Sequence, residues 1–261
     1  MPTPTPVPDS GTASSSVVAG AAASAPRMAI REPHLAPVVG RDGHLPPVPP
    51  DRLQPDALRA RFASTLRLPA GAGAAESAWN PELTGDAGPF LEPLREAAVL
   101  IALVRRPQGL TVLLTRRADD LNHHAGQISF PGGGRDPGDA DAIATALREA
   151  REEVGLAADE VEIIGRLPLY TTVTAYAVTP IVGLLAPPRA LAPDPLEVAD
   201  VFETPLEFLM DPANHRRHAI TIQGAERHFL SMPWGSDARG AAYFIWGATA
   251  AMLRNLYRFL A

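Results

Sequence analysis

The stretch GQISFPGGGRDPGDADAIATALREAREEVGL, residues 126–156, joins a glycine run to a strongly charged helical pattern. Pro131 and the glycines at 132–134 interrupt a strand-like segment, and the Asp-rich turn after them can cap the start of a helix. At about 100° per residue, one helix face then carries only apolar side chains: Ile143, Leu147, Ala150 and Val154. We therefore expect a strand, a glycine loop and a core-facing helix that ends at Gly155.

Three glutamates project from a roughly opposite arc of the same helix. Glu149, Glu152 and Glu153 are related as i, i+3 and i+4, so their carboxylates can bind one hard cation or a pair of cations. Without a cation, like charges at this spacing repel one another. The alternative is an ordinary solvated helix face on which Arg148 and Arg151 offset the acids. Spacing alone leaves both interpretations open.

The glycine run favours the cation site. Exposed amide N–H groups attract a phosphate, whereas an acidic helix repels one. A substrate that arrives as a complex of phosphate and metal suits both features.

The same stretch resembles the box of the Nudix hydrolases. Residues 148–156, REAREEVGL, preceded by Pro-Gly-Gly, are similar to G-x5-E-x7-R-E-U-x-E-E-x-G-U, in which U is apolar. With Gly133 as the box glycine, Asp139 replaces the first glutamate and one extra residue precedes Arg148. With Gly134 as the box glycine the length is kept, but Ala140 takes that place. We prefer the first alignment because it retains an acid.

The resemblance implies a metal-dependent hydrolase of nucleoside diphosphates linked to another group. It implies that Glu149, Glu152 and Glu153 hold Mg²⁺ or Mn²⁺ and form the catalytic set together with Arg148. Asp139 and Gly155 would then support the structure. The general base is not assigned by the motif, and Asp194, Glu197 and Glu203 are candidates from later in the chain.

A second resemblance lies upstream of the box. Residues 113–117 (LLTRR), Leu121, His124, 126–127 (GQ) and 130–133 (FPGG) are similar to the signature of the coenzyme A pyrophosphatase branch, approximately LLTxRSxxLRxHxGQxxFPGG. Ala118 and Asn122 stand where that signature has Ser and Arg. The two resemblances together cover about residues 95–260. They imply substrate contacts from Arg116, Arg117, His124, Gly126, Gln127, Gly132 and Gly133.

The expected reaction is hydrolysis of the pyrophosphate linkage of coenzyme A or a derivative, which gives 3′,5′-ADP and 4′-phosphopantetheine. Two other hypotheses are open. The box also fits another nucleoside diphosphate derivative, such as ADP-ribose or NADH. A non-catalytic Nudix-fold regulatory module is a different class, and the intact acids at 149, 152 and 153 argue against it. For the two arginines and the histidines at 123 and 124, a solvated strand end is the alternative to phosphate binding.

Composition excludes several other classes. The net charge of −6 argues against a nucleic-acid binder or a protein of anionic membranes. The chain has no cysteine, so disulfides and thiolate metal sites are excluded, and all 23 basic residues are arginine, which excludes Schiff-base lysine chemistry. His215 and His218 form an H-x-x-H without a third ligand, for which we expect a surface role. The partner that the resemblance implies is a small nucleotide substrate, and a homodimer is left open.

The composition and the apolar pattern along the chain predict one folded domain. Residues 1–50 are rich in Pro and Ala, for which we expect a disordered tail. Residues 17–25 are small and apolar but lack a basic flank, so we expect a cytoplasmic protein without a signal peptide. Residues 51–94 should form a helix and an extension that wraps the surface, and residues 95–261 the Nudix domain. Its expected fold is α/β, a mixed β-sheet sandwiched between α-helices, with strands at 97–104, 110–117, 161–172, 176–185, 218–223 and 227–232, a short helix at 205–210 and a closing helix from 243.

Overall fold

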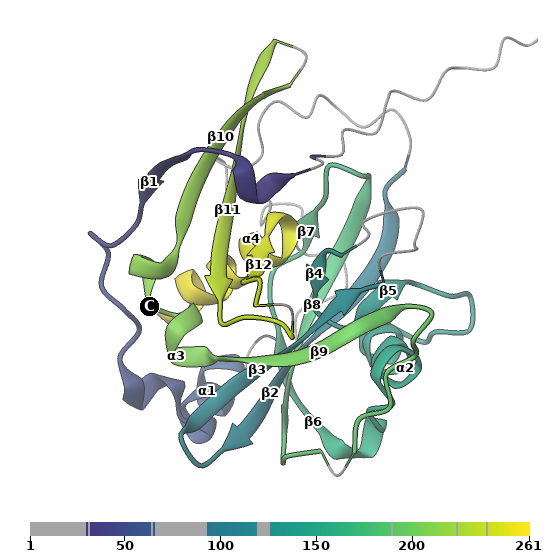
Figure 1. Ribbon diagram of the computed structural model, residues 1–261. Helices are drawn as coiled ribbons and strands as arrows, with labels where there is room; N and C mark the ends of the chain where they lie inside the picture. Colours follow the sequence, from purple (N-terminus) through teal and green to yellow (C-terminus); the bar gives the residue numbers. More distant parts are fainter. Residues whose placement is uncertain are drawn as a thin grey trace, which may run out of the picture.

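The computed structural model describes residues 30, 32–63, 65, 93–118, 126–188, 190–222, 224–238 and 240–261. Within them, two β-sheets and four α-helices pack into a mixed α/β fold (Figure 1). This confirms the expected fold class. No helix in the described part of the chain is long and apolar enough to cross a membrane.

The larger sheet is mixed and is built around strand β2 (Arg95–Arg106). β2 forms the expected hairpin with β3 (Gly109–Arg117) and pairs in parallel with β8 (Tyr176–Leu185). The path runs β4-β3-β2-β8-β6, where β4 is Ile128–Ser129 and β6 is Val161–Arg166. β7 (Tyr170–Thr171) pairs with β8, which divides the single strand expected at 161–172 into two.

Two further strands of this sheet were not expected. β5 (Gly132–Gly134) pairs with β2, so the predicted glycine loop is a short strand. β9 (Val198–Pro205) pairs with β3 over most of its length, although residues 198–205 lack a clear alternation of apolar and polar side chains. Both strands contact the acidic helix α2 (Ala142–Val154).

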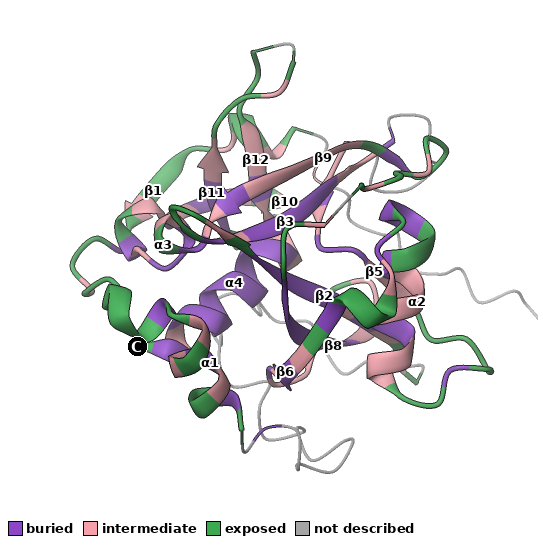
Figure 2. Cartoon of the chain, turned by 90° about the horizontal axis from the view of Figure 1, so that it is seen from below, coloured by how far each residue is buried: buried purple, intermediate pink, exposed green. Residues whose placement is uncertain are grey.

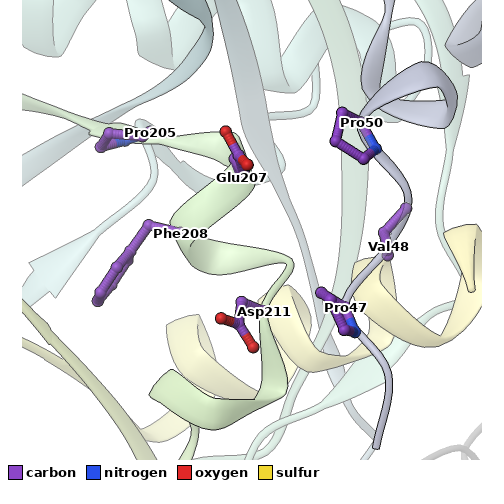
Figure 3. A pocket seen from close by; sticks show the side chains of 7 residues that line it. All are labelled: Pro47, Val48, Pro50, Pro205, Glu207, Phe208 and Asp211. Carbon is purple, nitrogen blue, oxygen red and sulfur yellow. The ribbon is translucent and has the colours of Figure 1, made fainter.

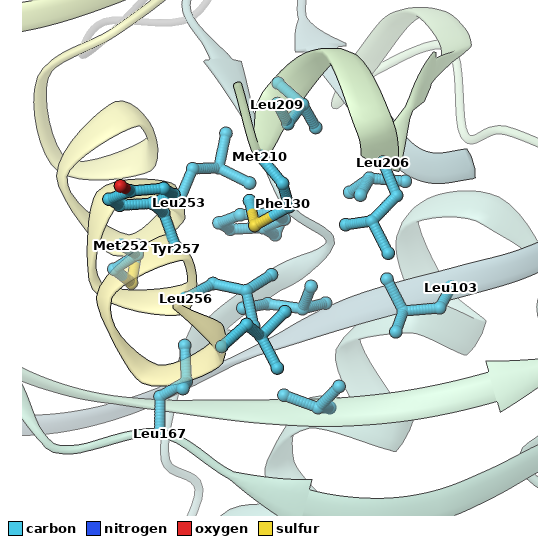
Figure 4. Close-up of a cluster of buried hydrophobic side chains, with 14 of the residues drawn as sticks. Leu103, Phe130, Leu167, Leu206, Leu209, Met210, Met252, Leu253, Leu256 and Tyr257 are labelled. Atoms are coloured by element: carbon cyan, nitrogen blue, oxygen red, sulfur yellow. The ribbon is translucent and has the colours of Figure 1, made fainter. Parts of the chain in front are cut away.

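Side chains of β2 alternate between two hydrophobic clusters, as the pleat of a strand requires. Ala98, Leu100, Ala102 and Val104 face α2, whereas Ile101 and Leu103 face the opposite layer. That layer contains α4 (Gly247–Leu260), which is buried along nearly its whole length (Figure 2). Figure 4 shows the leucines of α4 packed with Leu103 and Phe130. The sheet is thus covered by a helix on each face.

A second, antiparallel sheet lies on the α4 side, in the order β1-β10-β11-β12. β10 (Arg216–Ile222) and β11 (Ala225–Trp234) form the expected hairpin. β12 (Tyr243–Trp246) corrects the prediction of one closing helix from 243, because YFIW pairs with β11 and the helix begins only at Gly247. The expected short helix is α3 (Leu206–Leu209), and the 3₁₀ turn Pro212–Asn214 leads from it to β10. Another 3₁₀ turn, Ala158–Glu160, lies between α2 and β6.

Part of the segment expected to be disordered is folded. Residues 33–35 form a 3₁₀ turn, and β1 (Val38–Arg41) pairs with β10 at the edge of the second sheet. Pro50–Leu53 is another 3₁₀ turn, and α1 (Pro55–Phe62) is a shorter form of the helix expected from residue 51. Residues 1–29 and 66–92 lie outside the described part, so the remaining domain boundaries stay predictions.

A buried ion pair ties the N-terminal segment to the core. Asp42 and Arg254 of α4 are each 2% exposed, with 3.2 Å between Arg254 Nη2 and Asp42 Oδ2. Arg217 Nε donates to the other oxygen of Asp42 at 2.7 Å. Burying a charge is costly unless it is paired, so each member of this pair depends on the other.

His215 and His218 are buried, which corrects the expectation of a surface role. The Nδ1 atom of His215 accepts from Arg254 and its Nε2 donates to the Leu209 carbonyl, and burial lowers the pKa of His215 to about 4. His218 bonds to the Ala36 carbonyl and the Ser231 hydroxyl. The His215 ring therefore connects α3 to α4, and the His218 ring connects β10 to β11 and to the segment before β1.

We predict that Asp42→Asn lowers the free energy of unfolding by about 3 kcal/mol, because it leaves the buried Arg254 without a counter-charge. Urea denaturation of the full chain measures this change. Asp56→Asn is the matched control, since Asp56 forms an exposed ion pair with Arg59 and its loss should leave the unfolding free energy nearly unchanged. Equal stability of the two variants would contradict the structural role of Asp42.

Candidate active site

Helix α2 begins and ends where its sequence signals place the boundaries. The Asp141 side chain accepts a hydrogen bond from the Ala144 amide at 2.9 Å and caps the first turn. Gly155 adopts a left-handed φ of 71° at the other end, where its amide and that of Leu156 satisfy the last carbonyls. These two signals fix the position of the glutamates along the helix axis.

Strand β5 brings backbone, rather than side chains, against the acidic helix (Figure 1). A Cβ at Gly132 would lie 2.5 Å from the Ala98 carbonyl oxygen, and a Cβ at Gly133 would lie 2.6 Å from the Glu149 carboxylate. Both distances are too short for real atoms. The glycines at 132 and 133 are therefore required by close packing, whereas a Cβ at Gly134 would meet nothing within 4 Å.

Glu153 is the most buried of the three glutamates, with 2% of its surface exposed. This differs from the expected solvent-facing arc, because Glu153 follows Ala150 by one helical turn and shares its buried side. The Gly132 amide donates to Glu153 Oε2 at 3.2 Å, and Arg117 Nη1 lies 3.6 Å from Glu153 Oε1. Burial raises the pKa of Glu153 to about 7, although the Gly132 hydrogen bond and the Arg117 charge oppose this shift.

Arg148 joins the remaining acids of the site. Its Nε and Nη2 atoms donate to the two oxygens of Asp139 at 3.1 and 3.0 Å, and Nη2 also donates to the Gly134 carbonyl. Nη1 donates to Glu149 and Glu152, each at 2.9 Å. The Arg148 hydrogen bond holds the pKa of Asp139 well below its usual range. The pairing of Asp139 with Arg148 supports the alignment that takes Gly133 as the box glycine.

The chemistry of the acidic cluster fits a hard divalent cation, but its geometry is not preformed for one. Three carboxylates are the oxygen ligands that Mg²⁺ and Mn²⁺ prefer, and burial raises the pKa of Glu149 as well, so a cation would relieve desolvated negative charge. The described residues nevertheless contain no group of three His, Asp or Glu side chains already arranged to hold a metal ion. Arg148 and Arg117 stand beside the carboxylates instead.

The two adjacent arginines of β3 lie on different faces of the sheet. Arg117 approaches Glu153 on the α2 face. Arg116 is paired across the sheet with Asp200 of β9, and its charge acts on Tyr243, whose hydroxyl donates to Asp200 at 2.6 Å. The alternation of side chains along a strand explains this separation. Of the two, the structure brings only Arg117 to the acidic cluster.

Two of the remaining predicted substrate contacts, Gly126 and Gln127, are positioned by backbone hydrogen bonds to Arg117. Gly126 donates to the Arg117 carbonyl, and the Gln127 carbonyl accepts from the Arg117 amide, so both residues flank the end of β3. The Gly132 amide donates to Glu153 Oε2, and its contact with substrate stays a prediction. His124, with Leu121 and Asn122 of the upstream signature, lies outside the described residues.

Three acids were weighed in the sequence as the general base, and the structure separates them. Glu203 is paired with Arg106 and Thr111 on β3 and its neighbour β2, and the carboxylate of Asp194 bonds the Leu196 amide. Glu197 is exposed, and its charge acts on both Glu149 and Glu153. Its backbone carbonyl accepts from the Ala118 amide, directly after Arg117. Sequence reasoning could not rank these residues because β9, which follows Glu197, was not expected.

A cavity elsewhere in the molecule contains none of the predicted site residues. It has a volume of about 410 Å³ and lies between residues 47–50 and the start of α3, with Glu207 and Asp211 among its lining side chains (Figure 3). The acidic cluster on α2, which carries the motif, is therefore the candidate active site.

Comparison with known proteins identifies the class of protein that this fold and site define. The family model described as NUDIX domain matches residues 94–221. An Escherichia coli K12 protein named uncharacterized Nudix hydrolase NudL is 45% identical over 163 residues, which are 62% of this chain and 81% of that protein. A Shigella flexneri protein of the same name is 45% identical over 168 residues, 63% of this chain and 83% of that protein.

The chain belongs to the Nudix hydrolase family and is a pyrophosphohydrolase of that family. Enzymes of the family typically use a divalent metal ion, and their substrates are small nucleotide derivatives.

Two solved structures illustrate how far the similarity extends among known structures. A binary complex of the C. elegans Ap4A hydrolase is 21% identical, covers 45% of this chain and 85% of its own, and has a TM-score of 0.38. An Enterococcus faecalis MutT/nudix family protein is 13% identical, covers 72% and 69% respectively, and has a TM-score of 0.39. These scores are low, so the family assignment rests on the family model and on the sequence relatives.

We predict that Gly133→Ala reduces kcat by at least about tenfold, because the new methyl group displaces the Glu149 carboxylate. Folding should survive, since a Cβ at this position meets only the movable end of a side chain. Steady-state kinetics and a thermal melt measure the two effects. Gly134→Ala is the matched control and should change neither; a Gly133→Ala enzyme with normal kcat would show that the position of Glu149 is unimportant.

Proposed function

We propose that the protein hydrolyses the pyrophosphate linkage of coenzyme A or one of its derivatives to 3′,5′-ADP and 4′-phosphopantetheine. The observation that carries the proposal is the meeting of Arg117 with Glu153, which puts an anion-binding group beside the acidic cluster. Gly126 and Gln127, which belong to the residues that resemble the coenzyme A pyrophosphatase signature, hydrogen-bond to the Arg117 backbone and support the choice of substrate.

In this proposal Glu149, Glu152 and Glu153 hold Mg²⁺ or Mn²⁺. When bound, such a cation neutralises charge on phosphate oxygens and lowers the pKa of an attacking water. Arg148 orients Glu149 and Glu152 through Nη1, and Asp139 fixes Arg148 from the other side. The Gly132 amide orients Glu153, and β5 holds Glu149 in place by contact.

We assign the proton-accepting role to the Glu197 carboxylate. The Glu197 carbonyl accepts from the Ala118 amide at 2.8 Å, which places this exposed residue next to Arg117 at the end of β3, and its charge acts on both Glu149 and Glu153. Glu203 is already bonded to Arg106 and Thr111, and Asp194 bonds a backbone amide, so neither carboxylate faces the cluster without a competing partner. Arg117 contributes positive charge for the pyrophosphate.

The three glutamates are tested by Glu153→Gln. We predict a loss of kcat of at least about a hundredfold, because the neutral amide removes one charge that holds the cation. The variant should fold, since glutamine keeps the side-chain volume. Glu160→Gln, an exposed residue of the following turn, is the control with the same change. Near-normal turnover by Glu153→Gln at saturating metal would contradict the assignment.

The substrate is tested by a panel of coenzyme A, dephospho-coenzyme A, ADP-ribose and NADH, with Mg²⁺ and with Mn²⁺. We predict the highest kcat/KM for coenzyme A. Dephospho-coenzyme A isolates the 3′-phosphate, for which a charge-assisted contact is worth roughly 1.5–3 kcal/mol, or tenfold or more in KM.

A higher kcat/KM for ADP-ribose or NADH would reject coenzyme A as the substrate while leaving the metal chemistry in place. Failure to cleave any of the four compounds would favour the non-catalytic regulatory module, which the retained acids on α2 otherwise argue against.

A further inference from the structure

The two arginines beside the acidic cluster are held very differently. Arg148 is fixed by two hydrogen bonds to Asp139 and one to the Gly134 carbonyl, in addition to its contacts with Glu149 and Glu152. For the Arg117 guanidinium, the described part of the chain shows a single contact, the 3.6 Å approach to Glu153. This distance is that of an ion pair and exceeds that of a good hydrogen bond. Arg117 is therefore the arginine that can leave its partner at low cost.

Glu153 restricts where a cation can reach it. The carboxylate is almost fully buried, and its Oε2 atom is bonded to the Gly132 amide. Its other oxygen, Oε1, faces Arg117, whose side chain is 29% exposed. A cation that binds Glu153 through Oε1 therefore enters the space next to the Arg117 guanidinium, and the two positive charges repel.

The position of Arg117 at the end of β3 allows its side chain to change orientation. Arg117 is the last residue of β3, and its backbone is held by Gly126 and Gln127 rather than by its side chain. The side chain can thus turn toward solvent without breaking the sheet. A substrate pyrophosphate bound at the acidic cluster would offer the guanidinium negative charge to bind.

We propose that Arg117 is an exchangeable counter-ion of Glu153. It neutralises the buried carboxylate before a divalent cation binds, and it moves to a phosphate of the substrate once the cation has taken its place. This inference rests on the proposed function for the phosphate-bearing substrate. It adds that cation and substrate favour each other's binding through one side chain, as linkage between two sites requires.

The exchange predicts opposite effects of one substitution. In Arg117→Gln, titration of the full chain with Mn²⁺ alone, followed by electron paramagnetic resonance, should give a dissociation constant about threefold to fivefold lower than in the unsubstituted protein, because a competing ion pair is lost. With saturating Mn²⁺, KM for coenzyme A should rise by about tenfold, because the phosphate loses its partner. Arg117→Lys, which keeps the charge, should restore much of both values.

Arg151→Gln is the matched control. It removes the same charge from α2 itself, at an exposed position that makes none of the side-chain contacts described for Arg148 and Arg117, so it should leave the Mn²⁺ dissociation constant nearly unchanged. A thermal melt of each variant shows that the fold is intact.

Weaker Mn²⁺ binding in Arg117→Gln would overturn the proposal and make Arg117 a structural support of Glu153. An unchanged Mn²⁺ affinity, or tighter binding with an unchanged KM, would overturn it as well, because either result removes one half of the exchange. The Mn²⁺ titration contains no substrate. It therefore tests the competition with Glu153 even if coenzyme A is not the compound cleaved, in which case the KM comparison is made with the preferred substrate of the panel.

Discussion

The close approach of α2 to β5 is the constraint on which the rest of the structure depends. The helix can lie at this distance only because β5 has no side chain at Gly133, where a Cβ would overlap the Glu149 carboxylate. The same approach lets the Gly132 amide reach Glu153 and puts the Glu149 carboxylate over Gly133. The approach of α2 thus requires a glycine at 133 and positions two catalytic candidates, whereas Gly132 is required by the neighbouring strand β2.

This packing has an electrostatic consequence. Glu149 and Glu153 lose much of their hydration beside β5, and burial raises the pKa of both. Arg148 and Arg117 partly offset the charge, one through fixed hydrogen bonds and the other through a longer ion pair. The site therefore consists of poorly solvated carboxylates with arginines as counter-ions, an arrangement in which a divalent cation has a strong driving force to bind.

The local signals in the sequence were sufficient for α2 and for most of the main sheet. The Asp-rich turn, the apolar stripe and Gly155 predicted both ends of α2, and the apolar runs predicted β2, β3 and β8. The sequence does not indicate β9 because its side chains do not alternate clearly between apolar and polar. It does not separate β12 from the helix that follows, because a short apolar run such as YFIW fits a helix as well as a strand. Both segments are strands because β9 pairs with β3 and β12 pairs with β11, and such pairing leaves no local pattern in the sequence.

The same limit applies to the site. The motif predicted which acids gather on α2, whereas the pairing of Asp139 with Arg148 is a finding of the structure that the altered spacing of the box does not predict. The burial of Glu153, the separation of Arg116 from Arg117 and the buried ring of His215 depend on which strand or helix covers each residue. The ordered segment around Asp42 was also missed, because its composition favours disorder and its partner Arg254 lies at the far end of the chain.

The central claim is that the carboxylates of α2 form the cation site. Anomalous diffraction from a crystal soaked in Mn²⁺ tests it most directly. The account predicts a peak bonded to oxygens of Glu149, Glu152 and Glu153, with Arg117 no longer beside Glu153. A strong Mn²⁺ peak elsewhere in the molecule, with Arg148 and Arg117 still on these carboxylates, would contradict it.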